Sequence, residues 1–218
     1  MQVNLNALCV RPVLKSEEPR YRELMQQHHY LGDLSKIGHT LWYVATYAGE
    51  WSALLSFSAS AWKCGVRDRW IGWDFRHQFD RLNLIANNSR FLILPEWHYP
   101  NLGSKVLSLC HQRIAGDWQT HFGQPLLLLE TFVDPSRFHG TVYRAANWTC
   151  LGLTRGFRRT REGYSVNAPS PKLFFILPLQ CDARAQISSP ILNPIYRTGA
   201  PRIMLTAQQM RTLPDFFN

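Results

Sequence analysis

The sequence predicts an α/β fold in which helices flank a mixed, splayed central sheet, followed by a proline-rich C-terminal appendage. Segments rich in β-forming residues alternate with segments of helical apolar spacing. A strand–helix–strand–helix–strand run fills the centre of the chain, and the crossover connections of such a run produce parallel pairing. We therefore expect one domain over residues 1–180 and a mostly irregular extension over residues 181–218.

Local signals set the expected boundaries of the elements. Ser16 precedes two acidic residues and Pro19, which is the composition of a capped first helical turn. Gly49 separates two β-rich segments and predicts a hairpin. The expected helices cover residues 16–28, 74–81, 102–122, 136–147 and 206–211. The expected strands are one before the first helix and those over residues 41–48, 51–59, 84–94, 126–133, 148–153 and 173–177, with irregular segments over 60–73 and 155–169.

Composition excludes several classes of protein. The chain has 218 residues, of which 45% are hydrophobic and 18% are charged, so it is too apolar to be disordered. No apolar run reaches the ~18 residues of a membrane span, and the first ten residues lack the features of a signal peptide. The five cysteines are widely spaced and never form a CxxC motif. This argues against a disulfide framework and against a zinc site built on cysteines, and it fits a reducing cytoplasm. Since no apolar run is long enough to span a membrane, we also expect no membrane partner.

The net charge of +9 is concentrated in the last third of the chain. Residues 1–136 hold 13 Lys and Arg against 12 Asp and Glu, whereas residues 137–218 hold 11 against 3. Arginine outnumbers lysine 19 to 5, and its planar fork suits phosphates and stacks on bases. The charge distribution therefore indicates a polyanionic partner, with DNA as the first candidate.

One basic loop stands out because four arginines fall within residues 155–161 around a glycine. Such a loop contacts phosphates or is a solvated hairpin tip. Arg137 and Arg144 lie seven residues apart on the expected helix 136–147, so they would share a face of that helix. The residues expected to bind nucleic acid are Arg90, Arg137, Arg144, Arg155, Arg158, Arg159 and Arg161.

Two acidic residues flank the carboxyl end of the expected strand 126–133. Ligands of open α/β sheets sit at such strand ends, so Glu130 and Asp134 are candidates for a general base and for the group that orients it. Asp134 has a second interpretation, as the cap of the following helix. His29 is a further catalytic candidate, with an ordinary histidine at a helix end as the alternative.

Other polar and aromatic residues give weaker signals. The histidines lack the spacing of metal ligands, so no metal site is predicted. Trp62, Trp70 and Trp73 lie among lysine and arginine residues and could stack on bases. The alternative is that these tryptophans belong to the core.

The element order resembles the GNAT acetyltransferase fold. A strand over residues 91–94 leads through a turn to a helix that opens at Ser104. In that family the amides of this turn hold the pyrophosphate of acetyl-CoA, so the resemblance assigns Asn101, Gly103 and Ser104 to the cofactor. Only Gly103 fits the family's glycine pattern, because Asn101 replaces the middle glycine and Pro100 removes an N–H group. We therefore expect acetyl-CoA to bind weakly or not at all, and the identity of any cofactor is unknown.

The same resemblance implies a role for Tyr143. GNAT enzymes often place a tyrosine at this point, where it returns a proton to the leaving thiolate. The alternative is a core aromatic that packs its helix against the sheet.

Four sequence blocks resemble the DruA family, which is known from Druantia anti-phage systems and from transposon-associated proteins. The blocks are Arg67–Trp73, Asn87–Pro95, Glu130–Pro135 and Gly140–Trp148. The resemblance implies a setting in defence or mobile DNA more firmly than it implies a reaction.

These observations support two functions of different classes. The first is a nucleic-acid-binding protein of an anti-phage defence or mobile-element system, which modifies or processes DNA in a GNAT-like cleft. The alternative is a CoA-dependent N-acyltransferase that acts on an amine or a protein. A catalytically empty module that recruits a helicase or a transposase is a third possibility.

Overall fold

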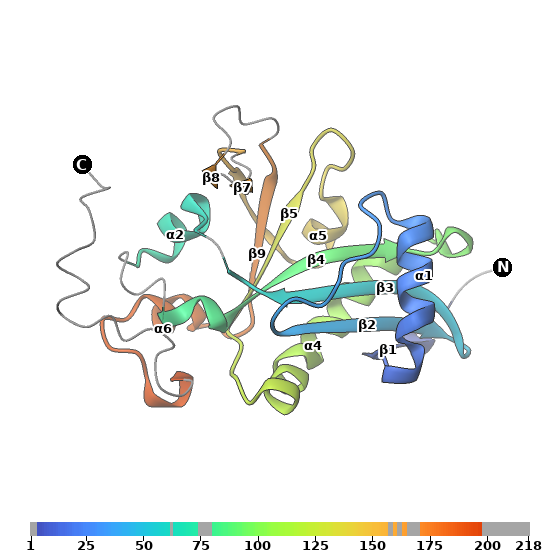
Figure 1. Ribbon diagram of the computed structural model, residues 1–218, viewed down its shortest axis with the longest axis horizontal. Helices are drawn as coiled ribbons and strands as arrows, with labels where there is room; N and C mark the ends of the chain where they lie inside the picture. Colours follow the sequence, from blue (N-terminus) through green and yellow to red (C-terminus); the bar gives the residue numbers. More distant parts are fainter. Residues whose placement is uncertain are drawn as a thin grey trace.

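The computed structural model describes residues 4–61, 63–73, 80–156, 159–160, 163–164 and 171–197 (Figure 1). Its helices are α1 (Glu18–His28), α2 (Gly65–Ile71), α4 (Leu102–Phe122), α5 (Thr141–Ala145) and α6 (Ala183–Ser188). The long α4 begins and ends where the apolar spacing predicts, and Gly123 ends it in the left-handed conformation with φ of 63°. Among the described helices, none has both the length and the apolar character needed to cross a membrane.

Seven strands form the central sheet in the order β1-β2-β3-β4-β5-β9-β6. Their bounds are β1 (Leu8–Pro12), β2 (Thr40–Tyr47), β3 (Glu50–Ala59), β4 (Ile85–Ile93), β5 (Leu128–Val133), β6 (Thr149–Leu153) and β9 (Leu173–Pro178). The short strands β7 (Arg159–Thr160) and β8 (Gly163–Tyr164) pair separately. The predicted hairpin is confirmed, because β2 and β3 pair antiparallel around Ala48 and Gly49.

The feature that positions the site is the divergence of β4 from β5. These two strands pair in parallel, but only over Ile85–Asn87 against Leu128–Glu130. Beyond that point they separate, and Figure 1 shows the two ribbons opening into a V. The expected mixed, splayed sheet is therefore confirmed.

Helices cover both faces of the sheet. On one face, α4 buries its apolar side against alternate residues of the strands, with Trp118 fully enclosed. On the opposite face, α1 packs Tyr21 and Met25 against β2 and β3, and the Tyr21 ring stacks on Trp42 at 4.6 Å between ring centroids. The helices α2 and α6 cover the other half of that face.

Three expectations about local structure are corrected. The helix expected over residues 136–147 begins only at Thr141, because Asp134 organises a turn before it and Gly140 adopts φ of 70°. Residues 65–71, expected to be irregular, form α2. Part of the C-terminal extension joins the core, since Ile187 and Tyr196 are buried beneath α2 and β9. The helix expected over residues 206–211 and most of that over 74–81 lie outside the described residues.

Candidate functional site

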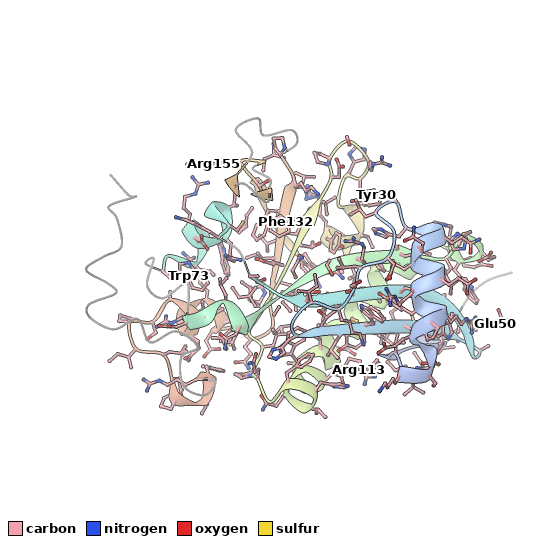
Figure 2. All side chains as sticks on the ribbon, in the orientation of Figure 1. Tyr30, Glu50, Trp73, Arg113, Phe132 and Arg155 are labelled. Atoms are coloured by element: carbon pink, nitrogen blue, oxygen red, sulfur yellow. The ribbon has the colours of Figure 1, made fainter. Side chains whose placement is uncertain are left out.

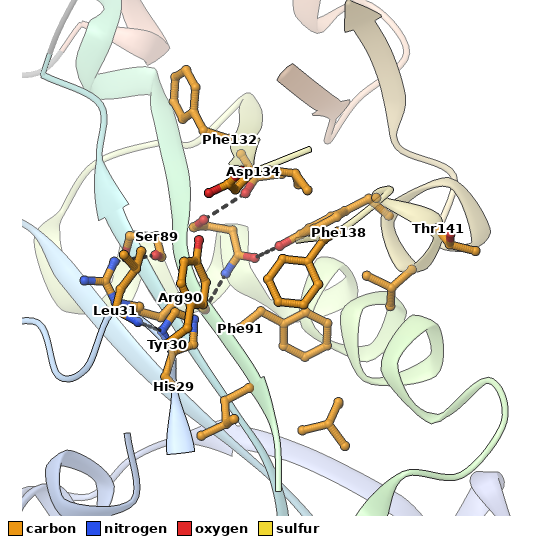
Figure 3. Close-up of a pocket in the computed structure, with 18 of the residues that line it drawn as sticks. His29, Tyr30, Leu31, Ser89, Arg90, Phe91, Phe132, Asp134, Phe138 and Thr141 are labelled. Carbon is orange, nitrogen blue, oxygen red and sulfur yellow. Dashed lines mark hydrogen bonds between the residues drawn. The ribbon is translucent and has the colours of Figure 1, made fainter. Parts of the chain in front are cut away.

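A cavity of about 770 Å³ occupies the opening between β4 and β5. Its size is typical of sites that bind small molecules. Its walls come from the end of α1, the diverging strands and the loop that leads into α5. In Figure 3, Tyr30 and Arg90 lie on one side of the cavity and Phe138 and Thr141 on the other. The lining combines aromatic rings, asparagine amides and positive charge.

The floor of the cavity is a closed hydrogen-bond network around Asn88. The amide nitrogen of Asn88 donates to the carbonyl oxygens of Ser56 and Arg90, at 3.1 and 3.0 Å. The Asn88 Oδ1 atom is thereby left as an acceptor, and the Tyr143 hydroxyl donates to it at 2.7 Å. The Thr131 hydroxyl, on β5, donates to the Asn88 carbonyl oxygen on β4 at 2.9 Å. These hydrogen bonds fix the orientation of the Asn88 side-chain amide at the floor of the cavity.

Tyr143 lines the cavity, as a catalytic role would require, but its hydroxyl proton is already engaged in the hydrogen bond to Asn88. Burial raises the pKa of Tyr143 to about 12, so the phenol stays protonated at neutral pH. Its O–H bond points at Asn88, which has no other free acceptor on its amide. To give a proton to a bound substrate, Tyr143 would first have to break that hydrogen bond.

Arg90 brings a half-buried positive charge to the cavity. Its guanidinium donates to the carbonyl oxygens of Gly32 and Ser89, at 3.1 and 2.8 Å. Within the described part of the chain, no carboxylate lies within ion-pair distance of it. Burial accordingly lowers the pKa of Arg90. A partly desolvated cation without a counter-ion is a favourable place for an anionic ligand.

His29 also lines the cavity and is neutral. Its Nδ1 atom accepts the Leu31 amide at 3.1 Å, so the ring carries its proton on Nε2. Burial, and then the charge of Arg90, lower the pKa of His29 to about 4. At neutral pH His29 therefore offers an N–H donor from Nε2 rather than a basic lone pair.

Asp134 is placed at the cavity, at the end of β5. It accepts hydrogen bonds from the Ser136 hydroxyl and amide, at 2.6 and 3.0 Å, and these bonds lower its pKa. The carboxylate is thus ionised at neutral pH, with Lys172 also lining the cavity. The second interpretation of Asp134 is wrong, because the N-cap of α5 is Gly140 and the Asp134 side chain closes the preceding turn with Ser136 instead.

Glu130 does not reach the cavity. Glu130 pairs with Asn87 in the part where β4 and β5 still run side by side, whereas the β5 lining of the cavity consists of residues 131–134, where the strands have separated. The Glu130 carboxylate receives both Arg67, at 3.1 and 3.2 Å, and the Ser60 hydroxyl at 2.5 Å. The side chains of Arg67 and Glu130 are 1% and 3% exposed. The structure therefore separates Glu130 from Asp134 and Tyr143 and places it in a buried ion pair.

The residues assigned to a cofactor lie outside the lining of this cavity. Asn101 precedes α4 in a left-handed conformation with φ of 63°, and its side chain makes no capping hydrogen bond. Gly103 packs against α5 so closely that a Cβ atom there would lie 2.8 Å from Val142 Cγ2. Ser104 donates its hydroxyl to the Asn101 carbonyl oxygen at 3.1 Å. The N-terminus of α4 is thus in close contact with α5.

The arginines expected to bind nucleic acid are dispersed. Arg137 precedes α5 and lies over the Tyr30 ring at 5.0 Å, whereas Arg144 lies over the Phe175 ring at 5.0 Å. They do not share a helix face, because α5 starts between them. Arg155 is exposed beyond β6, and in the view of Figure 2 Phe132 lies between it and Tyr30. Arg158 and Arg161 lie outside the described residues, and Arg159 is described only by its backbone in β7.

The tryptophans do not form an exposed stacking surface in the part of the chain that the structure describes. Trp73 is buried and donates its indole N–H to Asp68 at 3.2 Å. Trp70 is partly buried, with Arg184 over its ring at 5.2 Å. Trp62 lies outside the described residues. In the same described part, no group of three His, Cys, Asp or Glu side chains could hold a metal ion.

Sequence reasoning missed several residues that line the cavity. Asn88 and Thr131 hold its floor, and Lys172 contributes charge from the start of β9. Tyr30 and Phe138 form part of its rim and are 40% and 51% exposed. The available signal was the polar segment Asn87–Arg90 inside an otherwise β-rich stretch. Burying polar side chains in a central strand costs free energy unless they are hydrogen-bonded, so such a segment points to a site.

Comparison with known proteins gives the fold and the family. A structure of the aminoglycoside acetyltransferase AAC(6')-Ib with coenzyme A superposes with a TM-score of 0.52 at 13% identity, covering 81% of this chain and 98% of that one. A second structure of this enzyme, with paromomycin and acetyl-CoA, gives 0.52 at 12% identity, covering 85% and 99%. The fold is therefore the GNAT acetyltransferase fold that the sequence resembles. None of the curated proteins matches the chain.

The family assignment rests on sequence. A family model described as "Druantia protein DruA" matches residues 2–164, which include all four of the sequence blocks that resemble this family. The matched segment holds the whole of the diverging strands β4 and β5, as well as α5. The chain belongs to the DruA family.

Proposed function

We propose that this protein binds nucleic acid and accepts an unpaired nucleotide in the cavity between β4 and β5. The observation that carries the proposal is Arg90, a half-buried guanidinium without a carboxylate partner among the described residues, in a cavity with aromatic walls. A phosphate is the anion that a nucleotide would bring to it. The base would meet rings such as Phe91 and Phe132 on the walls.

Polar groups deep in the cavity support recognition of a base edge. Asn87 lines the cavity, and its Oδ1 atom is buried with no hydrogen-bond partner in the described structure. A buried acceptor without a partner is costly, and the exocyclic amine of a base would satisfy it. The neutral His29 adds a donor at the same cavity. Asp134, which lines the cavity at the end of β5, is the candidate base for a modification or processing step.

Membership of the DruA family supports a setting in anti-phage defence or mobile DNA. A helicase or a transposase is the partner that this setting suggests. We include both in the proposal, together with the basic loop at residues 155–161 as a further phosphate contact.

Titration of labelled single-stranded and duplex DNA, followed by fluorescence anisotropy, tests the proposal. Wild-type protein should bind DNA, and Arg90→Gln should weaken binding about tenfold or more, because the charge-assisted contact to phosphate is lost. Arg20→Gln is the matched control, since Arg20 is exposed on α1 and does not line the cavity. Equal affinities of the two variants would contradict a ligand at Arg90.

An acyltransferase is the second candidate, favoured by the AAC(6')-Ib structures that contain coenzyme A or acetyl-CoA. Against it stand Pro100, Asn101 and the close contact of Gly103 with Val142 at the N-terminus of α4. Calorimetry with acetyl-CoA separates the two functions. Micromolar binding of acetyl-CoA, without binding of DNA, would replace the nucleotide proposal by the acyltransferase.

A further inference from the structure

The rim of the cavity carries two large aromatic side chains that remain exposed. Tyr30 comes from the segment after α1 and Phe138 from the loop before α5, so the two belong to parts of the chain far apart in sequence. Their ring centroids are 5.6 Å apart, with the planes tilted by 56°. The rings are half exposed, at 40% for Tyr30 and 51% for Phe138. Exposed aromatic surface beside a cavity marks a site for a partner that covers it.

Positive charge is interleaved with these rings. The Arg137 guanidinium lies over one face of the Tyr30 ring, 5.0 Å from its centre, so a base would have to use the other face; Arg90 and Lys172 line the cavity beneath. His29 extends the row of rings, with its centroid 4.9 Å from that of Tyr30. Rings that accept bases, alternating with cations that accept phosphates, are the surface that single-stranded nucleic acid requires.

A duplex cannot use such a surface. Its bases stack on one another, so their faces are covered, and only an unpaired base can lie on the face of an exposed ring. We infer that Tyr30 and Phe138 form a stacking platform for unpaired bases, which makes single-stranded nucleic acid the substrate of the cavity. This inference rests on the proposed function, because the strand that crosses the platform is the one whose nucleotide enters the cavity.

Substitutions that keep the apolar character but remove the ring test the platform. Phe138→Leu and Tyr30→Leu should each weaken binding of single-stranded DNA about tenfold, whereas Tyr30→Phe should bind as wild type. The second probe is the same strand with one abasic nucleotide. If a base stacks on the platform, moving the abasic position along the strand should identify one position where the leucine variants and wild type bind equally well.

The outcomes separate this inference from the proposed function. The platform would be overturned if both leucine variants bound single-stranded DNA with wild-type affinity. It would also be overturned if the leucine variants lost the same affinity wherever the abasic nucleotide stood, or lost as much affinity for duplex DNA. If the platform falls while Arg90→Gln still weakens binding, the nucleotide cavity stands without it. If wild-type protein binds no oligonucleotide, both proposals fall. Thermal unfolding of each variant gives the folding control, because these exposed side chains contribute little to stability.

Discussion

Arg67 and Arg90 differ in how their positive charge is compensated. Arg67, on α2, is buried against two acidic residues, with its Nη1 atom on Glu130 and its Nε atom 3.1 Å from Asp68. Arg90, on β4, is half buried and meets only backbone carbonyl oxygens among the described residues. Both arginines lie in blocks typical of the same family, and the sequence does not show whether either charge is paired. We infer from the comparison that losing one partner of a compensated buried charge costs stability, whereas Arg90, half buried with no carboxylate at ion-pair distance among the described residues, is a candidate site for a ligand.

The largest expected effect comes from breaking the compensated pair. Glu130→Gln should lower the free energy of unfolding by about 3 kcal/mol or more, because the buried Arg67 loses a carboxylate that accepts two of its hydrogen bonds. Urea denaturation measures this loss. The double variant Arg67→Met with Glu130→Leu should lose less, since neither member of the buried pair is left without the other, and Asp68 keeps its hydrogen bonds from the Cys64 amide and the Trp73 indole. A cost below about 1 kcal/mol for Glu130→Gln would remove the contrast between the two arginines.

Replacing Arg90, in contrast, should have little effect on the free energy of unfolding. Arg90→Met should change the free energy of unfolding by less than about 1 kcal/mol, because the lost hydrogen bonds to Gly32 and Ser89 are offset by relief of a half-buried charge. The same denaturation experiment compares it with Glu130→Gln. A loss as large as that of Glu130→Gln would mean that Arg90 is structural and would weaken its role as an anion site.

The pH dependence of stability sharpens the comparison. The folded pKa of His29 is about 4, below its ordinary value of 6.5, so the unfolded chain binds a proton first as the pH falls. Stability should therefore be complete above pH 6.5 and decrease between pH 6.5 and about 4.

Arg90 provides the test, because its charge contributes to the low pKa of His29. In Arg90→Gln the His29 resonance in an NMR titration should shift its midpoint upward. His111 is the internal control, since burial alone lowers its pKa to about 4 and its Nε2 atom is held by the Trp148 indole at 2.9 Å. Parallel shifts of both histidines would point to a general loosening of the fold instead.

The smallest effect on stability is expected for the arginines of the basic loop. Changing Arg158, Arg159 and Arg161 together to alanine should alter stability by no more than about 0.5 kcal/mol, as is usual for surface substitutions. Binding of DNA should weaken across all sequences, and the slope of affinity against salt should flatten by about one unit per lost phosphate contact. Unchanged affinity and slope would leave these arginines as a solvated surface.

Several elements could be predicted because their signals are local. The apolar spacing and Gly123 define α4, and the turn at Gly49 defines the hairpin. The α2 helix was missed because its first residue is Gly65 and its N-terminal cap makes no side-chain hydrogen bond. The helix before Asn147 was predicted too long, because the propensity of residues 136–139 is overridden by the Asp134 turn. Of the expected site residues, Asp134, Tyr143, His29 and Arg90 line the cavity, whereas Glu130 lies outside it in a buried ion pair.

The sequence by itself determined the α/β class, the order of the central elements and the family, because propensity, apolar spacing and ordered motifs are properties of contiguous residues. Only the tertiary structure decided which polar residues meet. The strand around Glu130 is a continuous apolar run, so its pattern does not reveal which of its residues reach the cavity. The point where β5 separates from β4 decides this, and Glu130, on the paired side of that point, is bound by Arg67 from a segment 63 residues earlier in the chain. Tyr30 and Phe138 likewise meet only because two loops far apart in sequence end at the same opening of the sheet. A local sequence pattern cannot predict that these two rings come into contact.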